Sequence, residues 1–490
     1  MADFRPVLLV IGTFVAVLGA SMVLPVLANV LDGSEAARAS AHAFVASAIM
    51  LMVVGGGLAL ACRGKVERIS TRQGFLITTA SWLALVIGAA VPMGIGPGSM
   101  SVTDAFFESM SALTTTGATV VTGLDDQPAG FLLWRSMLQW FGGIGVVIMA
   151  IAVLPFLSIG GMQLFRLESS DKSDKILPGA DDLAAAVFGL YVAMTAMCFF
   201  AYWFFGMGAF DALNHAMTTV ATGGFSTKDA SFGYFMDSEM VRGPIDIVAV
   251  VFMIAGSLPF GLYLLVLRGK GAILEDSQVR FFLGLVVFFI SLMTIRVVVA
   301  LDFNIVEALR LSSFNIVSIM TGTGYASTDY NAWGPFALGV FFCVMFLGGC
   351  AGSTSCGLKV FRLQVAIAAL SVYTQKLSHP HRVTVARYNG RPLDESVFRS
   401  VLTFFFIYFT VFATVAVGLS LFELDSVTAL SAAGSAIANV GPGLGEVVGP
   451  SGNYASLPMG AKWILSVAML LGRLELFTVL VLFVPSFWVR

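Results

Sequence analysis

Charged residues are scarce in this chain. Asp, Glu, Lys and Arg make up 11% of its 490 residues, hydrophobic residues make up 58%, and the mean hydropathy is +0.90. Ordinary globular domains carry about 25% charged residues, so a soluble protein of this length is excluded. The composition predicts an all-α polytopic membrane protein.

Cysteine and histidine are also few and scattered. The five cysteines form no CxxC pair, so we expect buried apolar thiols and no metal site; they are Cys62, Cys198, Cys343, Cys350 and Cys356. A membrane enzyme using Asp and His chemistry is disfavoured, because no HExxH, GxSxG or paired intramembrane aspartates appear. The chain also lacks a Walker A sequence and a dinucleotide-binding fingerprint, so nucleotide control must come from another protein, and we expect no organic cofactor in this chain.

Ten apolar stretches are long enough to span a bilayer, which needs about 20 mainly apolar residues. The predicted spans are 7–31, 42–62, 74–92, 130–157, 180–205, 244–267, 277–300, 335–372, 397–421 and 460–488. The first exceeds the 7–15-residue apolar core of a signal peptide. We therefore interpret it as a retained helix.

Basic residues predict the orientation, because Lys and Arg are retained on the cytoplasmic side during insertion. With the amino terminus inside, 19 of the 27 basic residues are cytoplasmic, and so is the carboxyl terminus. The residues left outside are Arg38, Lys228, Arg242 and Lys462, and those within apolar or pore segments are Arg135, Arg296, Arg310 and Arg473. The basic loops are not interleaved with aromatics, so no nucleic-acid partner is expected.

Four short polar segments lie between paired spans and end in similar turns. They are 104–116, 211–222, 306–323 and 426–440, and their turns are Thr116-Gly117, Thr222-Gly223, Thr323-Gly324 and Val440-Gly441. Each segment fits a short helix that enters the membrane and returns, and we expect Asp211 to cap the second. The recurrence predicts four pore modules in one chain. Glycine-bearing external loops of a transporter without a pore are the alternative.

Turns at membrane depth need a reason, because non-helical backbone is tolerated there only where it is buried in protein or lines water. In a pore, a ring of carbonyls replaces the hydration shell of a cation, and the carboxyl ends of the short helices add negative partial charge. Glycine allows the dihedrals that turn carbonyls inward. The pattern therefore predicts a cation pore.

Several motifs of the chain are similar to those of one family. They are Thr114–Thr119, Ala221–Thr227, Thr321–Tyr325 and Asn439–Gly443, joined by 348–357 and 472–477. The chain resembles the membrane subunit of Trk-type bacterial potassium uptake systems, within the Trk/Ktr/HKT superfamily, over nearly its whole length. Two helices before the repeats, and Arg166–Ser170 after the first repeat, favour the Trk type over the Ktr type.

The resemblance implies a fold with two amino-terminal helices and four helix–pore loop–helix repeats around one pseudo-fourfold pore. The expected divisions are 1–70 for the extension, then 71–175, 176–272, 273–385 and 386–490 for the repeats.

The resemblance also implies the residues of a selectivity filter. They are Thr115, Thr116, Gly117, Ala221, Thr222, Gly223, Gly322, Thr323, Gly324, Asn439, Val440 and Gly441. Glycine at the first filter position of all four repeats implies transport of potassium, with rubidium tolerated, whereas serine in the first repeat marks sodium-preferring relatives. The full TVGYG filter is absent, so selectivity over sodium is expected to be weaker. The alternative is a sodium-permeable or weakly selective transporter, and both channel-like flux and symport fit the pattern.

The segment 348–357 interrupts a predicted helix with four glycines and three hydroxyl residues in ten positions. Each mid-helix glycine costs about 1 kcal/mol relative to alanine, so the helix should break here. The resemblance implies an intramembrane gating loop, which includes Gly348, Gly349, Gly352, Ser353, Thr354 and Gly357. Close helix packing by small residues is the alternative.

Arg473 lies midway along the last predicted span, where a charge signals a polar lining or a partner. The resemblance implies an electrostatic barrier below the filter, and a structural network with Glu475 or with carbonyls is the alternative.

The family pairs this subunit with a cytosolic nucleotide-binding protein of the TrkA type and implies a homodimer in the bacterial inner membrane. Docking surfaces for the cytosolic protein are expected at the basic loops 163–179, 268–280 and 373–399, although membrane topology alone would also explain their charge.

Overall fold

The computed structural model describes residues 4–64, 70–96, 99–152, 180–236, 238, 241, 243–269, 271, 273–381, 385–389 and 391–488. The regular secondary structure of this part is helical apart from two short antiparallel strands, β1 (Arg387–Tyr388) and β2 (Arg391–Pro392). The prediction of an all-α chain is confirmed.

The amino-terminal unit is a helical hairpin. It consists of α1 (Arg5–Ser21), α2 (Val23–Asp32) and α3 (Glu35–Ala61). Glycine lets α1 and α3 touch, since a Cβ atom on Gly12 would lie 2.7 Å from the carbonyl oxygen of Gly55. Asn29 then ties the hairpin to the rest of the chain by accepting the backbone N–H of Gly130 at 2.7 Å.

The order long helix, short inner helix, further helix occurs four times, and we call these groups the first to fourth modules. The first holds α4 (Thr71–Ile95), α5 (Val102–Leu113) and α6 (Ala129–Ala152). The second holds α9 (Ala180–Phe204), α10 (Ala209–Val220), α12 (Ile245–Gly256) and α13 (Phe260–Leu267). The third holds α14 (Ser277–Leu301), α15 (Ile305–Met320), α16 (Pro335–Phe346) and α17 (Val360–Ser378). The fourth holds α18 (Glu395–Ser420), α19 (Ser426–Ala438), α21 (Met459–Arg473) and α22 (Phe477–Leu480).

Short helices complete the described chain. They are α11 (Gly233–Met236), α20 (Gly445–Val448), α23 (Pro485–Trp488) and the 3₁₀ turns η1 (Leu124–Asp126), η2 (Ile273–Glu275), η3 (Tyr330–Trp333) and η4 (Val481–Phe483).

Side chains begin three of the four inner helices, α5, α10, α15 and α19. Ser101, Asn304 and Asp425 each accept a backbone N–H in the first turn of their helix, which satisfies a donor that a helix start leaves free. The prediction that Asp211 caps α10 is wrong. That helix follows Gly208 without a side-chain cap, and Asp211 instead accepts the hydroxyl of Thr227 at 2.6 Å.

The membrane-spanning helices lie where the sequence predicted them, but three of the predicted spans are bent or divided. Seven helices in the described residues are long and apolar enough to cross a membrane, or nine if two bent pairs count as one span each. The bends are 92° between α12 and α13 and 106° between α21 and the stretch 477–483. The remaining predicted span, 335–372, is divided into α16 and α17.

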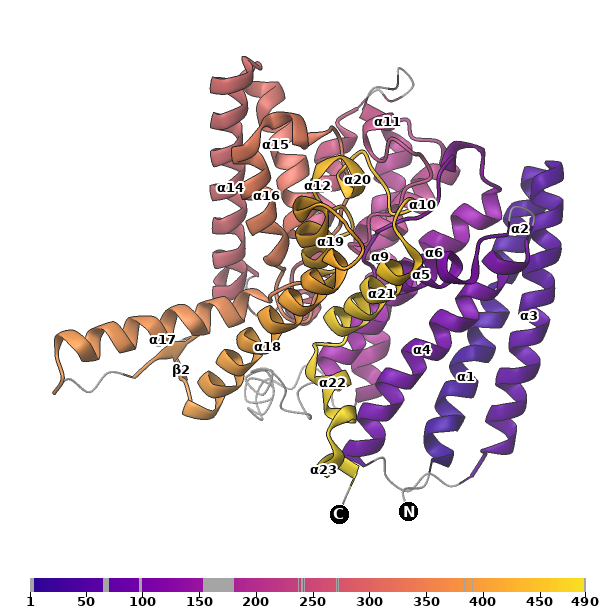
Figure 1. The fold of residues 1–490 in the computed structure, drawn as a ribbon, viewed down its shortest axis with the longest axis horizontal. Coiled ribbons are helices and arrows are strands. Elements are labelled where there is room, and N and C mark those ends of the chain that lie inside the picture. The colour runs from indigo at the N-terminus through magenta and orange to yellow at the C-terminus, as the bar shows by residue number, and fades with distance from the viewer. Residues whose placement is uncertain are drawn as a thin grey trace.

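Burial separates outer from inner helices. The apolar window of α14 is 22% buried, whereas that of α6 is 72% buried. An apolar helix that buries little of its surface in protein is suited to face lipid. Figure 1 shows α14 and the hairpin of α1 and α3 at opposite edges, with α17 projecting beyond the other helices.

Candidate functional site

Each inner helix ends in the same kind of turn. One residue of every turn has left-handed backbone: Thr115 (φ 51°), Thr222 (φ 50°), Gly322 (φ 74°) and Asn439 (φ 54°). The next residue donates its N–H to the carbonyl five residues back at 2.8–3.0 Å, in the pairs Thr116–Ser111, Gly223–Thr218, Thr323–Ser318 and Val440–Ser435. Helices commonly end in this way. Left-handed backbone costs an ordinary residue about 1–2 kcal/mol, so the surroundings must hold the two threonines in place.

A glycine with positive φ comes next in every turn. The four are Gly117 (83°), Gly224 (78°), Gly324 (83°) and Gly441 (106°). The sequence alignment of the second turn, which matched Gly223 with Gly117, is therefore wrong by one residue. Gly223 occupies the position of Thr116, Thr323 and Val440. Because Gly223 and Gly224 are adjacent, the sequence could not show which of them corresponds to Gly117. The backbone hydrogen bonds show that it is Gly224.

These turns close into a ring. A Cβ atom would lie 2.4 Å from the Gly223 oxygen if built on Gly117, 1.8 Å from the Thr323 oxygen on Gly224, 2.0 Å from the Val440 oxygen on Gly324, and 2.6 Å from the Thr116 oxygen on Gly441. Such distances leave no room for a side chain, so glycine is required for the close approach of the turns. The order runs from the first turn to the fourth and back to the first. Equivalent carbonyls of all four turns thus lie around one ring, which we call the carbonyl ring.

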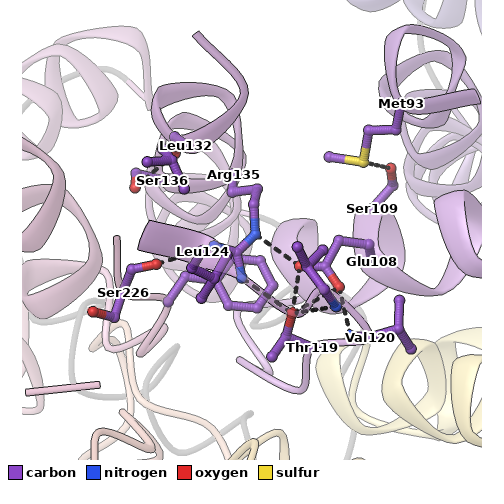
Figure 2. Close-up of polar contacts among 12 residues, drawn as sticks. Met93, Glu108, Ser109, Thr119, Val120, Leu124, Leu132, Arg135, Ser136 and Ser226 are labelled. Carbon is purple, nitrogen blue, oxygen red and sulfur yellow. Dashed lines mark hydrogen bonds and ion pairs between the residues drawn. The ribbon is translucent and has the colours of Figure 1, made fainter. Parts of the chain in front are cut away.

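A buried ion pair braces the first turn (Figure 2). The Nε of Arg135 on α6 lies 2.8 Å from Oε1 of Glu108 on α5, and both side chains are almost wholly buried. Glu108 also accepts the N–H of Val120 at 2.9 Å and the hydroxyl of Thr119 at 3.0 Å. Neither charged residue is among the predicted site residues, although a charge within an apolar segment is a signal of a buried polar site.

Arg135 also reaches the second module. Its Nη1 donates to the Ser226 carbonyl at 3.0 Å, and its guanidinium lies 4.0 Å from the centre of the Phe225 ring. The pair with Glu108 therefore links the chain after the first turn to the chain after the second.

Two cavities lie at this site, one against the carbonyl ring and one against the segment 348–357. One has a volume of about 70 Å³ and is lined by Gly117, Gly224, Gly324 and Gly441 of the carbonyl ring, together with Tyr454 and neighbouring loop residues. The other has a volume of about 20 Å³ and is lined by residues of 352–359 and by Gly472, Arg473 and Glu475. The four turns thus line the first cavity, and the segment 348–357 lines the second.

The segment 348–357 breaks the helix as predicted, since α16 ends at Phe346 and α17 begins at Val360. Gly352 and Gly357 have φ values of 74° and 73°. A Cβ atom on Gly348 would lie 1.9 Å from the Cys356 carbonyl oxygen, and one on Gly349 would lie 2.8 Å from the Ser257 carbonyl oxygen. The predicted glycines thus allow a tight loop against its neighbours.

The bend between α12 and α13 satisfies the backbone of this loop. Cys350 donates its N–H to Ser257 at 2.9 Å, and Thr354 donates to Gly256 at 3.1 Å. In return, Phe260 donates its N–H to the Gly352 carbonyl at 2.9 Å. Two irregular segments at membrane depth therefore supply each other's partners, as a buried loop requires.

Hydroxyl groups hold the loop against the ends of two inner helices. Thr354 Oγ1 lies 3.0 Å from the Val220 carbonyl oxygen at the end of α10 and 2.9 Å from that of Gly256. Ser355 Oγ donates to the Thr321 carbonyl after α15 at 2.6 Å. The third hydroxyl, that of Ser353, donates to Cys350 within the loop. The loop thus covers one side of the carbonyl ring.

Arg473 fixes the same loop from α21. It is 2% exposed, and its Nη1 donates to the Thr354 carbonyl at 3.2 Å and contacts the Cys356 sulfur. Its Nη2 donates to the Gly142 carbonyl of α6 at 2.9 Å. Glu475 does not serve as its partner here, because it pairs with Arg362.

Lys359 is a further cation below the ring. Its ammonium donates to the Ser355 carbonyl, and the residue is 5% exposed. It lines the small cavity with Arg473 and Glu475. Lys359 is absent from the predicted site residues, because it was counted, for the orientation, among the 19 cytoplasmic basic residues.

Residues 40–489 match the family model TrkH, which is described as a cation transport protein. The chain belongs to the TrkH family. Curated relatives include the Trk system potassium uptake protein TrkI of Halomonas elongata, 43% identical over 99% of this chain and 97% of that protein. The Trk system potassium uptake protein TrkH of Escherichia coli is 36% identical over 99% of both.

A solved structure extends the comparison to the fold. The crystal structure of the potassium transporter TrkH from Vibrio parahaemolyticus has a TM-score of 0.89 and 34% identity, covering 99% of this chain and 100% of that chain. Membership of the TrkH family confirms the Trk resemblance, the multi-pass membrane class, and the prediction of a transport protein that is not an enzyme.

Proposed function

We propose that this protein takes up potassium through a pore that passes the carbonyl ring. The closed cyclic contact of the four turns carries the proposal. Carbonyl oxygens arranged in this way can replace the hydration shell of a cation, and no side chain interrupts the ring. The relatives are named potassium uptake proteins, which agrees with the proposed ion and with its transport into the cell.

The inner helices support cation binding at the ring. Each ends next to its turn, so the negative ends of four helix dipoles converge there. The ion-binding residues proposed are those of the predicted filter, with Gly224 added in the second turn. Rubidium, which resembles potassium in size and charge, should also pass.

We assign the gate to segment 348–357 and the electrostatic barrier to Arg473. The loop lies between the carbonyl ring and the cavity at Arg473, and it is tied to α10, α12 and α15. A cation leaving the ring would meet first this loop and then a buried guanidinium. The arrangement corresponds to a closed state, so opening requires the loop to move.

A cytosolic nucleotide-binding partner of the TrkA type remains the proposed source of that movement. Of its proposed docking loops, 163–179 lies outside the described residues, while most of 268–280 and 373–399 is described. The helix α17 supports the proposed homodimer, because it projects from the bundle and exposes the apolar side chains of Ile367, Leu370 and Leu377. A bacterial inner membrane, with both termini cytoplasmic, fits the distribution of basic residues.

One observation favours the weakly selective alternative. The four residues that precede the ring glycines are chemically unlike, two threonines with a glycine and a valine, so the ring departs from fourfold symmetry. Sodium permeation is therefore measured in the same experiment.

The test is uptake of radioactive rubidium by vesicles that contain the purified protein, with potassium or sodium as competitor. Gly324→Ser should weaken the preference for potassium, because its side chain would press on the Val440 carbonyl 2.0 Å away. Gly339→Ser is the matched control, since a Cβ atom there meets nothing within 4 Å. An unchanged potassium-to-sodium ratio in Gly324→Ser would overturn the proposed pore.

Absence of rubidium flux in the wild type has two explanations, a closed gate or the lack of a pore, and a further variant distinguishes them. Arg473→Ala, assayed in parallel, removes the contacts that hold the loop. If neither the wild type nor this variant moves rubidium, the proposed function fails.

A further inference from the structure

The second turn is held by a side chain from another module. Gln139 lies on α6, one helical turn after Arg135, and is fully buried. Its Nε2 donates to the Gly223 carbonyl at 2.5 Å, and its Oε1 accepts the N–H of Phe225 at 3.0 Å. A carbonyl can only accept and a backbone N–H can only donate, so these two partners fix the orientation of the amide.

Gln139 occupies the place where the other turns have a side chain. The residues equivalent to Gly223 are Thr116, Thr323 and Val440. In the first and third turns the threonine hydroxyl binds a second threonine hydroxyl, at 2.8 Å to Thr114 and at 2.7 Å to Thr321. At Gly223 a Cβ atom would lie 2.5 Å from the Cδ of Gln139. Glutamine at 139 therefore requires glycine at 223.

The Gly223 carbonyl belongs to the carbonyl ring, and its hydrogen bond to Gln139 distinguishes it from its equivalents. Within the described residues, the carbonyls of Thr116, Thr323 and Val440 accept no side-chain hydrogen bond. A donated N–H fixes a carbonyl in position and takes up part of its negative charge. The field that a ring of carbonyls exerts is one determinant of which cation it prefers.

We propose that Gln139 is a specificity-determining residue of the pore, acting on the ion through the Gly223 carbonyl. This inference rests on the proposed potassium pore. A weaker and fixed carbonyl favours the larger potassium ion, because a small ion such as sodium gains more from a strong field. Removal of the amide donor should therefore let sodium compete better.

The experiment is the rubidium competition assay on the full-length protein in vesicles, with Gln139→Leu as the main variant. We expect the concentration ratio of sodium to potassium needed for equal inhibition to fall by roughly three- to tenfold, the scale of one lost hydrogen bond. Ser136→Ala is the matched control on the same helix, because among the described residues its hydroxyl hydrogen-bonds only to the Leu132 carbonyl of α6. That variant should keep the wild-type ratio.

A pair of substitutions tests the mutual fit. Gly223→Ala alone should impair rubidium uptake, since its methyl group meets Gln139 at 2.5 Å. Adding Gln139→Ala should restore uptake while leaving the ratio altered, because the clash is relieved and the donor is still missing. If the role of Gln139 were purely structural, the double variant would regain both rubidium uptake and the wild-type ratio of sodium to potassium.

Gln139→Glu keeps the size of the side chain and decides the question if Gln139→Leu does not fold. Its carboxylate cannot donate to Gly223, so sodium should again compete better. A folded Gln139→Leu or Gln139→Glu with the wild-type ratio overturns the inference while leaving the potassium pore intact. Absence of potassium preference in the wild type would instead count against the proposed function.

Discussion

Among single residues, Arg473 joins three segments of the site. Its guanidinium joins α21 to the loop at Thr354 and Cys356 and to α6 at Gly142. A planar guanidinium can bind several acceptors at once in fixed directions, which an ammonium cannot. The proposed barrier would therefore act through both the charge of Arg473 and its hydrogen bonds.

Arg473→Ala should raise rubidium flux several-fold in vesicles that lack any cytosolic partner, because both the charge and the loop contacts are lost. Arg473→Lys should give an intermediate flux, since the charge stays and the contacts do not. Arg399→Ala is the control, because Arg399 is exposed and pairs with Glu395 on its own helix. Wild-type flux in Arg473→Ala would contradict the barrier.

Asp425 affects stability through a helix cap. Its hydrogen bonds to the side chain and backbone of Thr428 lower the pKa of its carboxyl below the ordinary value of 3.8. Asp425→Ala should lower the free energy of unfolding by about 1 kcal/mol. Unfolding in detergent measures this, and Asp394→Ala is the control because Asp394 precedes α18 without a side-chain cap.

The pH dependence of that stability follows from the sign of the shift. A carboxyl with a lowered folded pKa stabilises the fold above its unfolded pKa, and this contribution is lost as the pH falls through the folded value. Asp425→Asn keeps an acceptor for the cap and should reduce this acid-dependent loss. An unchanged acid profile would show that Asp425 contributes little.

The sequence predicted the four residues of the ring carbonyls and three of the four glycines with positive φ, but not the side chains that hold the turns. Gly117, Gly324 and Gly441 were predicted because a turn with positive φ favours glycine wherever it occurs. Gln139 and Glu108 could not be found in this way. Gln139 binds a carbonyl 84 residues away, and such pairing depends on how the modules come together.

Helix boundaries were predicted correctly where residues close in sequence determine them, and missed where distant residues do. All four inner helices lie within a few residues of the predicted segments, and the glycines of 348–357 do end α16. The two bends were not expected. At the second, Glu475 and Leu476 have φ values of 61° and 51° without glycine or proline. The ion pair of Glu475 with Arg362 fixes this bend and joins residues 113 positions apart.

The loop 348–357 as an element is held by two hydroxyls that reach other helices. Thr354→Val and Ser355→Ala together should raise rubidium flux without the partner, because the bonds to Val220, Gly256 and Thr321 are lost. Ser353→Ala is the matched control, since in the described part of the chain its hydroxyl binds only Cys350, within the loop. Equal flux in the double variant and the control would show that these hydroxyl contacts do not keep the proposed gate closed.

Polar contacts join the modules of the whole molecule. Lys462 and Asp104 pair at 2.6 Å between the fourth and first modules, and Arg310 and Asp246 pair at 2.8 Å between the third and second. The side-chain amide of Asn331 donates to the Gly445 carbonyl and accepts the Gly445 N–H, which joins the third and fourth modules. With Arg135 between the first and second, every neighbouring pair is connected. A ring built from one chain can thus keep its register even though its four turns differ.

The amino-terminal hairpin takes no part in these contacts between modules. A substitution in the hairpin should therefore change the stability of the protein without changing its ion preference. Gly55→Leu should destabilise the protein by about 1–3 kcal/mol, because a Cβ atom there would lie 2.5 Å from the Ala16 nitrogen of α1. Gly56→Leu is the control, since its Cβ atom meets nothing within 4 Å. We expect a lower melting temperature for Gly55→Leu alone and the wild-type potassium-to-sodium ratio for both, because no residue of α1 to α3 belongs to the carbonyl ring. A shifted ratio in Gly55→Leu would mean that strain in the hairpin reaches the first turn through α4 or α6, and selectivity would then be a property of the whole bundle.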